Sequence, residues 1–225
     1  MRILFLGQAG LYFEKASFGV LIDPYLSDSI GKRNSAMVRR VAVDPSFFDL
    51  KPQVMIFTHD HLDHFDPETA EHFLNRAEAM TVMGPRSVWS RARNFGGAHN
   101  YVQFDSGTLW TEGPFRFRAV KACHSDPDAI GVILEDGEKK YYVTGDTLYN
   151  EGIFPALPQG LEAVFLPING AGNNMNAADA AAFARRTGAK YAVPLHVGLY
   201  DDLAAESFPF ARKIIPEIYK EIVLP

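Results

Sequence analysis

The sequence predicts an α/β protein in which two packed β-sheets are covered by helices on their outer faces. Short apolar segments of strand length recur along all 225 residues, and helical patterns interrupt them in both halves. Hydrophobic residues make up 47% of the chain, which is enough for one large core. No linker or low-complexity run separates the halves, so residues 1–225 are expected to form a single domain.

The first half opens with short strands. Segments 2–7, 10–15 and 18–23 are rich in apolar and β-favouring residues and are separated by turn residues. Residues 27–49 are polar and irregular, which predicts a long loop. The continuous apolar run at 53–58 predicts a buried strand.

Helices and strands alternate next. A helix is expected after the buried strand, because Asp66 can cap it and Pro67 suits its first turn. A strand at 79–84 follows. A second helix should begin at Pro85 and end near Gly96, or at the glycine after it.

The second half begins with strands and ends with helices. Asp136 and Gly137 predict a hairpin between two of the strands. A third helix should be capped by Asn176 and closed by Gly188. A final amphipathic helical segment is expected from 203 to about 222, broken or kinked by Pro209 and Pro216. The strands of this half are predicted at 100–105, 108–113, 115–122, 129–136, 139–146, 162–168 and 190–197.

Composition and charge limit the partners and the compartment. The formal net charge is -5 and the isoelectric point is about 5.8, which disfavours nucleic acid as a partner. A single cysteine, Cys123, excludes an intrachain disulfide and fits a reducing cytoplasm. The apolar run before Gly7 is too short for a signal peptide, and no run is long enough for a membrane span. We therefore expect a cytoplasmic protein without a membrane or nucleic-acid partner, and a homo-oligomer stays open.

The densest group of metal-binding side chains follows the strand at 53–58. His59, His61, Asp63 and His64 combine imidazole with carboxylate, which suits zinc, iron or manganese. With strand-like alternation, His59 and His61 point to the same side. Asp63 and His64 come where the chain turns, so they can reach a second point. The cluster could thus serve two metals; the alternative is a solvated loop with capping aspartates.

Three further candidate ligands each come at the end of a predicted strand. His124, Asp146 and His196 each end an apolar strand and precede a polar or glycine-containing loop. This placement is expected if several strand ends converge on one cleft. His72 and His99 do not share the pattern, and we interpret them as structural or surface residues.

These motifs resemble those of the metallo-β-lactamase superfamily. The resemblance is carried by THDHLDH at 58–64, CHS at 123–125, TGDT at 144–147 and PLHVG at 194–198, with IDP at 22–24. It implies a four-layer αββα sandwich with the active site along one edge of the sheets. Within the superfamily, THDHLDHFD and the later segment from PINGAGNN to LYDD look like the L-ascorbate-6-phosphate lactonase-like group.

The resemblance also implies a role for each ligand. One metal ion would be held by three histidines, a second by a mixed group, and one aspartate would bridge them. Two more aspartates would orient ligand imidazoles. The first group is His59, His61 and His124, the second is Asp63, His64 and His196, the bridge is Asp146, and the orienting residues are Asp23 and Asp60.

The expected function is hydrolysis with two divalent metal ions, zinc first, with manganese or iron as alternatives. A hydroxide bridging the ions would attack a small ester, lactone or phosphorylated metabolite, and Asp63 or Asp146 would carry a proton to the leaving group. The partner is thus a small molecule, with anionic ones among the candidates. The alternative is a phosphodiesterase acting on RNA or a phospholipid head group. A diiron protein that reduces oxygen or nitric oxide, and a scaffold that keeps its metals for stability, are weaker alternatives.

Other polar residues are candidates for the substrate rim. An asparagine-rich loop before the helix at 176–188 could bind substrate or only form a turn, and Tyr200 could donate a hydrogen bond or lie on the surface. Cys123 is expected to be a buried core thiol. The basic residues of the long loop are expected to keep it soluble, with an acidic substrate as the alternative. The rim candidates are Asn169, Asn173, Asn174 and Tyr200, and the basic residues are Lys32, Arg33, Arg39 and Arg40.

Overall fold

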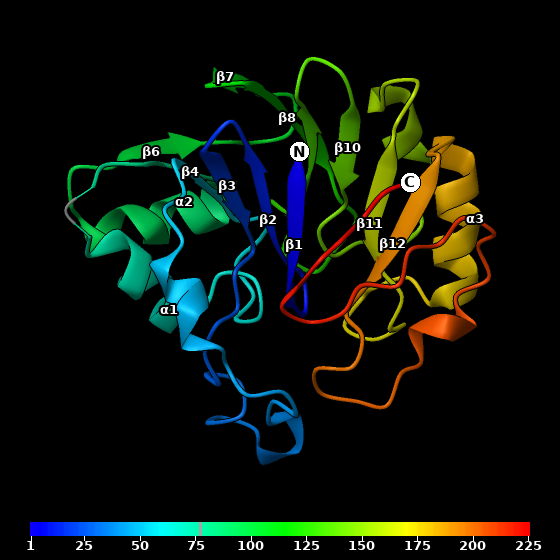
Figure 1. Ribbon diagram of the computed structural model, residues 1–225, viewed down its shortest axis with the longest axis horizontal. Helices are drawn as coiled ribbons and strands as arrows, with labels where there is room; N and C mark the ends of the chain where they lie inside the picture. The colour runs from blue at the N-terminus through cyan, green and yellow to red at the C-terminus, as the bar shows by residue number, and fades with distance from the viewer. Residues whose placement is uncertain (77) are drawn as a thin grey trace.

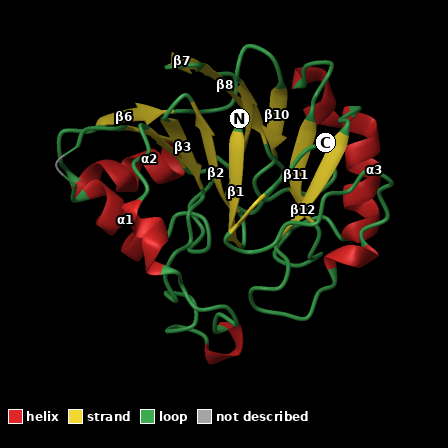
Figure 2. Cartoon of the chain, viewed as in Figure 1, coloured by secondary structure: helices red, strands yellow, loops and turns green. Residues whose placement is uncertain are grey.

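Two β-sheets stack face to face between outer helices, as the ribbon of the computed structural model shows for residues 1–76 and 78–225 (Figure 1). Helices α1 (Pro67–Leu74) and α2 (Arg86–Ala92) lie outside the first sheet, and α3 (Ala177–Thr187) lies outside the second (Figure 2). This layering is the predicted αββα sandwich.

The first sheet has seven strands in the order β13-β1-β2-β3-β4-β5-β6. Strands β1, β2 and β3 are antiparallel neighbours, and β3 to β6 run parallel. The bounds are β1 Arg2–Gly7, β2 Gly10–Lys15, β3 Phe18–Ile22, β4 Val54–Ile56, β5 Thr81–Gly84, β6 Asn100–Gln103 and β13 Lys220–Glu221.

The second sheet has six strands in the order β12-β11-β10-β9-β8-β7. Strands β7 to β10 are antiparallel, and β10, β11 and β12 are parallel. Because β8 is two antiparallel steps from β10, these two strands end at the same edge of the sheet. The bounds are β7 Leu109–Glu112, β8 Phe115–Lys121, β9 Ile130–Glu135, β10 Lys140–Val143, β11 Ala163–Pro167 and β12 Tyr191–Leu195.

Alternation along the strands builds three apolar layers. In β1, Ile3 and Phe5 face the other sheet, whereas Leu4 and Leu6 belong to the cluster beneath α1 and α2. A third cluster lies between the second sheet and α3. Phe13 and Phe165 meet edge to face across the two sheets, with ring centroids 5.6 Å apart. The continuous apolar strands of the sequence are therefore those that are covered on both faces.

The predicted helix caps and the hairpin are confirmed. The Asp66 side chain accepts a hydrogen bond from Thr69 N at the start of α1. The Asn176 side chain accepts from two backbone N–H groups at the start of α3, and Gly188 ends that helix in the left-handed conformation. Strands β9 and β10 form the antiparallel hairpin around Asp136 and Gly137. The second helix is shorter than predicted, since α2 ends at Ala92 and a 3-10 turn follows.

The predicted C-terminal helix is wrong. Residues 203–222 contain only the 3-10 turn Ala205–Ser207 and the short strand β13. The segment is otherwise extended and bonds to both sheets: Ile214 N donates to Ala192 O at 2.9 Å, and Tyr219 N donates to Phe5 O at 2.7 Å. Two prolines already disfavour a helix here, and the open edges of β1 and β12 offer backbone partners to an extended chain.

The two sheets are joined directly below the edge at which β4, β8, β10 and β12 end. Ile130 N, from the second sheet, donates a hydrogen bond of 3.0 Å to Thr58 O, which follows β4 of the first sheet. Gly145 packs against this junction with φ +60°, and a Cβ there would lie 2.7 Å from Ile130 O and 2.9 Å from Thr58 Cβ. Only glycine fits both the backbone angle and the space.

No helix of residues 1–76 and 78–225 combines the length and apolar character needed to cross a membrane.

We expect Gly145→Ala to lower the free energy of unfolding more than Gly137→Ala does. Gly137 also has a positive φ, +87°, but nothing lies within 4 Å of an added Cβ. Both variants should lose about 1–2 kcal/mol from the left-handed backbone, and Gly145→Ala should lose about 1–3 kcal/mol more from overpacking. Urea denaturation in the presence of a chelator measures both. Equal losses would show that the junction tolerates a side chain.

Candidate metal centre

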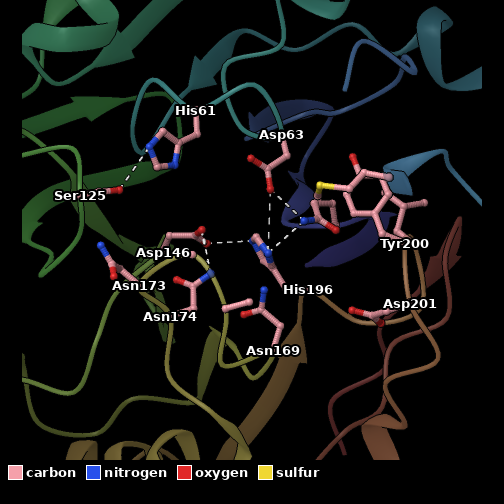
Figure 3. Close-up of a pocket in the computed structure, with 15 residues that line it drawn as sticks. His61, Asp63, Ser125, Asp146, Asn169, Asn173, Asn174, His196, Tyr200 and Asp201 are labelled. Carbon is pink, nitrogen blue, oxygen red and sulfur yellow. Dashed lines mark hydrogen bonds and ion pairs between the residues drawn. The ribbon is translucent and has the colours of Figure 1, made fainter. Parts of the chain in front are cut away.

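Four strand ends bring the predicted ligands to one edge of the sandwich. His59 and the turn after it follow β4, His124 follows β8, Asp146 follows β10, and His196 follows β12. In Figure 3 the labelled side chains from these segments point toward one shared space. The centre therefore exists only when both sheets are correctly packed.

His59, His61 and His124 form the first ligand group. Their donor nitrogens lie within 4.8 Å of one another, and His61 Nδ1 is 3.1 Å from His124 Nε2. His59 Nδ1 lies 3.0 Å from Thr58 Oγ1, which leaves His59 Nε2 buried without a hydrogen-bond partner. Burial holds the pKa of His59 well below its ordinary value, so its imidazole is neutral. A neutral, unpartnered nitrogen facing two others fits a metal ion.

Asp63, His64 and His196 form the second ligand group, with donor atoms again within 4.8 Å. His64 Nε2 lies 3.2 Å from His196 Nε2 and 3.9 Å from Asp63 Oδ2. Two imidazoles and a carboxylate at this spacing suit a divalent ion of the zinc, manganese or iron type.

Asp146 lies between the two groups. Its Oδ1 is 2.8 Å from His196 Nε2 and 3.2 Å from His64 Nε2, and its Oδ2 is 3.9 Å from His124 Nε2. Burial alone would raise the pKa of Asp146, but His196 and His64 outweigh it and hold the pKa well below its ordinary value. Asp146 is therefore a carboxylate that reaches both groups.

Asp23 orients His64 by binding the ring nitrogen Nδ1, which leaves Nε2 for the centre. It is fully buried, with its Oδ2 2.8 Å from His64 Nδ1. Thr58 holds the carboxylate by donating from its backbone N at 2.7 Å and from its Oγ1 at 2.6 Å. This arrangement directs His64 Nε2 toward the second group. Burial opposes the charged form of His64, yet Asp146 and Asp23 raise its pKa well above the ordinary value.

Comparison with known proteins agrees with this geometry. Residues 19–197 match the family model described as the β-lactamase superfamily domain. The chain belongs to the β-lactamase superfamily. A UPF0173 metal-dependent hydrolase of Staphylococcus carnosus is 29% identical over 240 residues, covering 99% of this chain and 93% of that protein.

Solved structures place the chain in the metallo-β-lactamase fold. Igni18, a metallo hydrolase from Ignicoccus hospitalis, superposes with a TM-score of 0.77 at 16% identity, covering 98% of this chain and 97% of the other. An isothiocyanate hydrolase from Delia radicum gut bacteria gives a TM-score of 0.77 at 19% identity, with 99% and 98% covered. At these identities the likeness shows the fold alone. The lactonase-like resemblance stays a prediction.

Asp60 does not orient a ligand imidazole in this superfamily member, which corrects the prediction. Its Oδ2 lies 3.2 Å from Arg91 Nη1, and its side chain is 34% exposed. The residue stands in the turn after β4, where its backbone N donates to Asp126 Oδ2 at 3.2 Å.

Gln8 is a site residue that the sequence reasoning missed. Its Nε2 donates to Asp63 Oδ2 at 2.8 Å and lies 3.0 Å from His196 Nδ1, and its backbone O accepts from His196 N at 2.9 Å. It follows the apolar strand β1, so the strand-end criterion that identified Asp146 would also have identified Gln8. No motif marked it, because an amide is not a metal ligand of the expected kind.

Three non-glycine residues that contact the second ligand group have a positive φ. Gln8, Asp23 and His196 have φ values of +52°, +45° and +57°, a region that non-glycine residues rarely adopt. Asp23 N donates to Ile56 O at 3.0 Å and His196 N donates to Gln8 O at 2.9 Å, and the side chain of each of the three residues contacts the centre. Such strain at a site is typical of residues whose placement matters for function.

The rim residues line a cavity of about 450 Å³ beside the centre. Asn174 donates from Nδ2 to Asp146 Oδ2 at 2.8 Å, and Asn173 O lies 3.2 Å from His124 Nδ1. Asn169 and the half-buried Tyr200 also line the cavity (Figure 3). Two rim candidates therefore touch metal-binding residues directly, which the sequence did not predict.

Other singled-out residues have structural contacts. His99 Nε2 lies 2.7 Å from Leu74 O, and the His72 ring packs on Phe48 at 4.3 Å between centroids, as expected for structural residues. Cys123 is half-buried, so the prediction of a buried core thiol is wrong; it stands on the loop after β8, beyond the packed strand.

Three of the four basic residues of the long loop bind other residues of this chain. Lys32 pairs with Glu68 at 2.7 Å, and Arg40 pairs with Asp202. Arg39 donates from Nη1 to Tyr25 O at 2.6 Å and to Ser27 O at 3.1 Å. Arg39 therefore holds the loop in place, a role that neither interpretation anticipated.

We expect Gln8→Ala to weaken binding of a metal ion at the second ligand group about 10–100-fold, the usual effect of removing a group that orients ligands. Gln8→Glu should weaken it further, because a carboxylate would face Asp63. Competition with a chromophoric chelator measures the two binding constants. Asn169→Ala, which lines the same cavity, is the matched control. Unchanged affinity in Gln8→Ala would contradict the positioning role.

Proposed function

We propose that this chain is a metal-dependent hydrolase that holds two divalent ions and cleaves a small ester, lactone or related metabolite. The observation that carries the proposal is the placement of Asp146 between two three-residue ligand groups. Zinc is the first candidate, with manganese or iron as alternatives, because mixed imidazole and carboxylate donors suit all three.

The bound ions would supply the nucleophile by lowering the pKa of water to about 7, and would polarise the scissile oxygen. The protein contributes position and charge. His59 and Asp146 present fixed donors, one neutral and one anionic. Gln8, Asp23 and Thr58 hold the ligands in place through buried hydrogen bonds.

Asp63 is the better placed of the two aspartates to carry a proton to the leaving group. Asp146 is engaged through both oxygens, by Asn174 at Oδ2 and by two imidazoles at Oδ1. Gln8 holds Asp63 only through Oδ2, and the Asp63 side chain is 18% exposed and lines the cavity. Asp63 Oδ1 can therefore reach a substrate, as a general acid must.

A phosphodiesterase acting on RNA or a phospholipid head group is the less favoured function. The net charge of -5 gives no general attraction for a polyanion. No lysine or arginine is among the described residues that line the cavity. The fold likeness to an isothiocyanate hydrolase adds another small, uncharged electrophile to the compounds worth testing.

We expect His61→Ala and Asp63→Ala each to reduce the metal content from about two ions per chain to about one, and to reduce kcat/KM by at least about 1000-fold. His72→Ala is the control, because His72 is an exposed residue of α1 outside the centre, and it should keep both the metal content and the kcat/KM. Plasma emission spectrometry on protein purified without chelator measures the metal. Full metal content and activity in either site variant would exclude the proposed mechanism.

A substrate panel separates the two functions. We expect the metal-loaded protein to hydrolyse simple lactones, aryl esters or an isothiocyanate at least about 100-fold faster than bis(p-nitrophenyl) phosphate, because an uncharged carbonyl-type carbon fits a cavity without cationic side chains. Initial rates at equal protein concentration provide the comparison. A preference for the phosphodiester would favour the alternative function.

A further inference from the structure

We propose that the cavity beside the metal centre selects substrates whose part remote from the scissile bond is an uncharged hydrogen-bond donor, such as an alcohol or a primary amide. Substrates that carry a phosphate, carboxylate or sulfonate at that place would be excluded. The inference rests on the proposed hydrolase function and narrows its substrate class. It concerns the cavity away from the metal ions, which would themselves attract the scissile group.

Three residues of the cavity wall carry a buried polar atom that lacks a hydrogen-bond partner. Asn169 Oδ1, Asn174 Oδ1 and the Tyr200 hydroxyl are buried without a hydrogen-bond partner, and all three residues belong to the cavity wall. Buried polar atoms are nearly always hydrogen-bonded in folded proteins, so three exceptions in one cavity indicate that a ligand or water completes them.

The orientation of Asn174 decides which kind of ligand group fits. Its Nδ2 faces Asp146 Oδ2 at 2.8 Å, and a carboxylate oxygen can only accept. The amide therefore cannot rotate without placing two oxygens against each other, and Asn174 Oδ1 stays an acceptor. The residue is only 6% exposed and its Oδ1 is buried, so the donor that this oxygen lacks would have to come from a group that enters the wall from the cavity. Asn169 lacks such a constraint and can adapt.

Tyr200 is compatible with the same ligand. Burial raises the pKa of its phenol well above the ordinary value, with the Tyr25 hydroxyl and Asp63 adding to the shift. The hydroxyl is therefore protonated and can either accept or donate. An alcohol or amide group that donates a hydrogen bond to Asn174 could therefore form a second hydrogen bond with the Tyr200 hydroxyl.

The cavity offers no cationic side chain to an anion. Among the described residues on its wall there is neither lysine nor arginine. Two arginines of the adjacent loop are occupied, Arg39 by the Tyr25 and Ser27 carbonyls and Arg40 by Asp202, and the third, Arg33, is not among the residues that line the cavity. An anionic group would lose its hydration without gaining a charge-assisted hydrogen bond.

Asp201 adds a negative charge to the same wall. It is exposed, and its Oδ1 accepts from Leu203 N at 3.0 Å, which holds the carboxylate on this turn. Met37 and Leu199 supply apolar surface nearby. An anionic substrate tail would thus meet a carboxylate and an amide oxygen, whereas a hydroxyl or amide would find acceptors.

The test uses nitrophenyl esters with one leaving group and three acyl-chain ends: a carboxamide, a methyl group and a sulfonate. Because all three esters share one leaving group, differences in kcat/KM between them measure the effect of the acyl-chain end. We expect kcat/KM of the metal-loaded protein to be highest for the carboxamide and at least tenfold lower for the sulfonate. A sulfonate ester cleaved as well as the carboxamide ester would overturn the inference and leave the hydrolase function standing.

Two matched variants test whether Asp201 causes the preference for the carboxamide over the sulfonate. Asp201→Asn keeps an acceptor for Leu203 N but removes the charge, and should reduce the preference for carboxamide over sulfonate about fivefold at low ionic strength. Glu206→Gln makes the same charge change five residues along the chain, at an exposed residue that is absent from the cavity wall, and should leave the preference unchanged. Equal effects of the two variants would contradict a local role for Asp201.

Failure of the proposed hydrolase function can be distinguished from failure of the inference about the cavity. If the metal-loaded protein cleaves none of the three esters, the proposed function fails for this bond type. The cavity is then tested with the corresponding uncleavable anilides by isothermal titration calorimetry. Tighter binding of the sulfonate than of the carboxamide would overturn the inference about the cavity, and the reverse order would support it.

Discussion

The metal centre depends on the hydrogen bond that joins the two sheets between Ile130 N and Thr58 O. His59 follows a strand of the first sheet, whereas His124, Asp146 and His196 follow strands of the second. Neither sheet alone holds a complete ligand group of histidines. Thr58 has a second task at the same point, because its hydroxyl and backbone N hold Asp23. Sheet packing and ligand orientation are thus coupled through one residue.

The clustering of buried ionisable groups connects the fold to its metal ions. Five imidazoles and two carboxylates make up these overlapping groups, and His59 Nε2 has no hydrogen-bond partner. Burial of such groups is unfavourable unless opposite charges compensate them. Divalent ions would provide that compensation, so metal binding should also stabilise the folded chain. The strained backbone at Gln8, Asp23 and His196 fits the same picture, since the surroundings must hold these residues in place.

The sequence identified the side chains that the structure brings together, because strand periodicity and strand ends are local features. An imidazole or carboxylate directly after an apolar strand is visible without knowledge of the fold, and parallel strands then bring such residues together. Asp60 was misassigned because its carboxylate pairs with Arg91, a residue 31 positions away that the motif does not include. The contacts of Gln8 with Asp63 and His196 join residues 55 and 188 positions apart in the chain, beyond the reach of local patterns.

The C-terminal segment shows that a local pattern can predict the wrong secondary structure. Its amphipathic pattern suggested a helix, but the chain pairs with Ala192 and Phe5 at the edges of both sheets. That choice depends on which strand edges are open, a property of the whole topology rather than of residues 203–222. The asparagine-rich loop was likewise recognised as a rim, whereas the bond from Asn174 to Asp146 needed three dimensions.

Anomalous diffraction from crystals grown with a divalent metal ion tests the central claim most directly. The account predicts two anomalous peaks per chain, roughly 3.5–4 Å apart. One should lie among His59, His61 and His124, the other among Asp63, His64 and His196, with Asp146 in contact with both. A single peak at full occupancy, or peaks away from these residues, would contradict it.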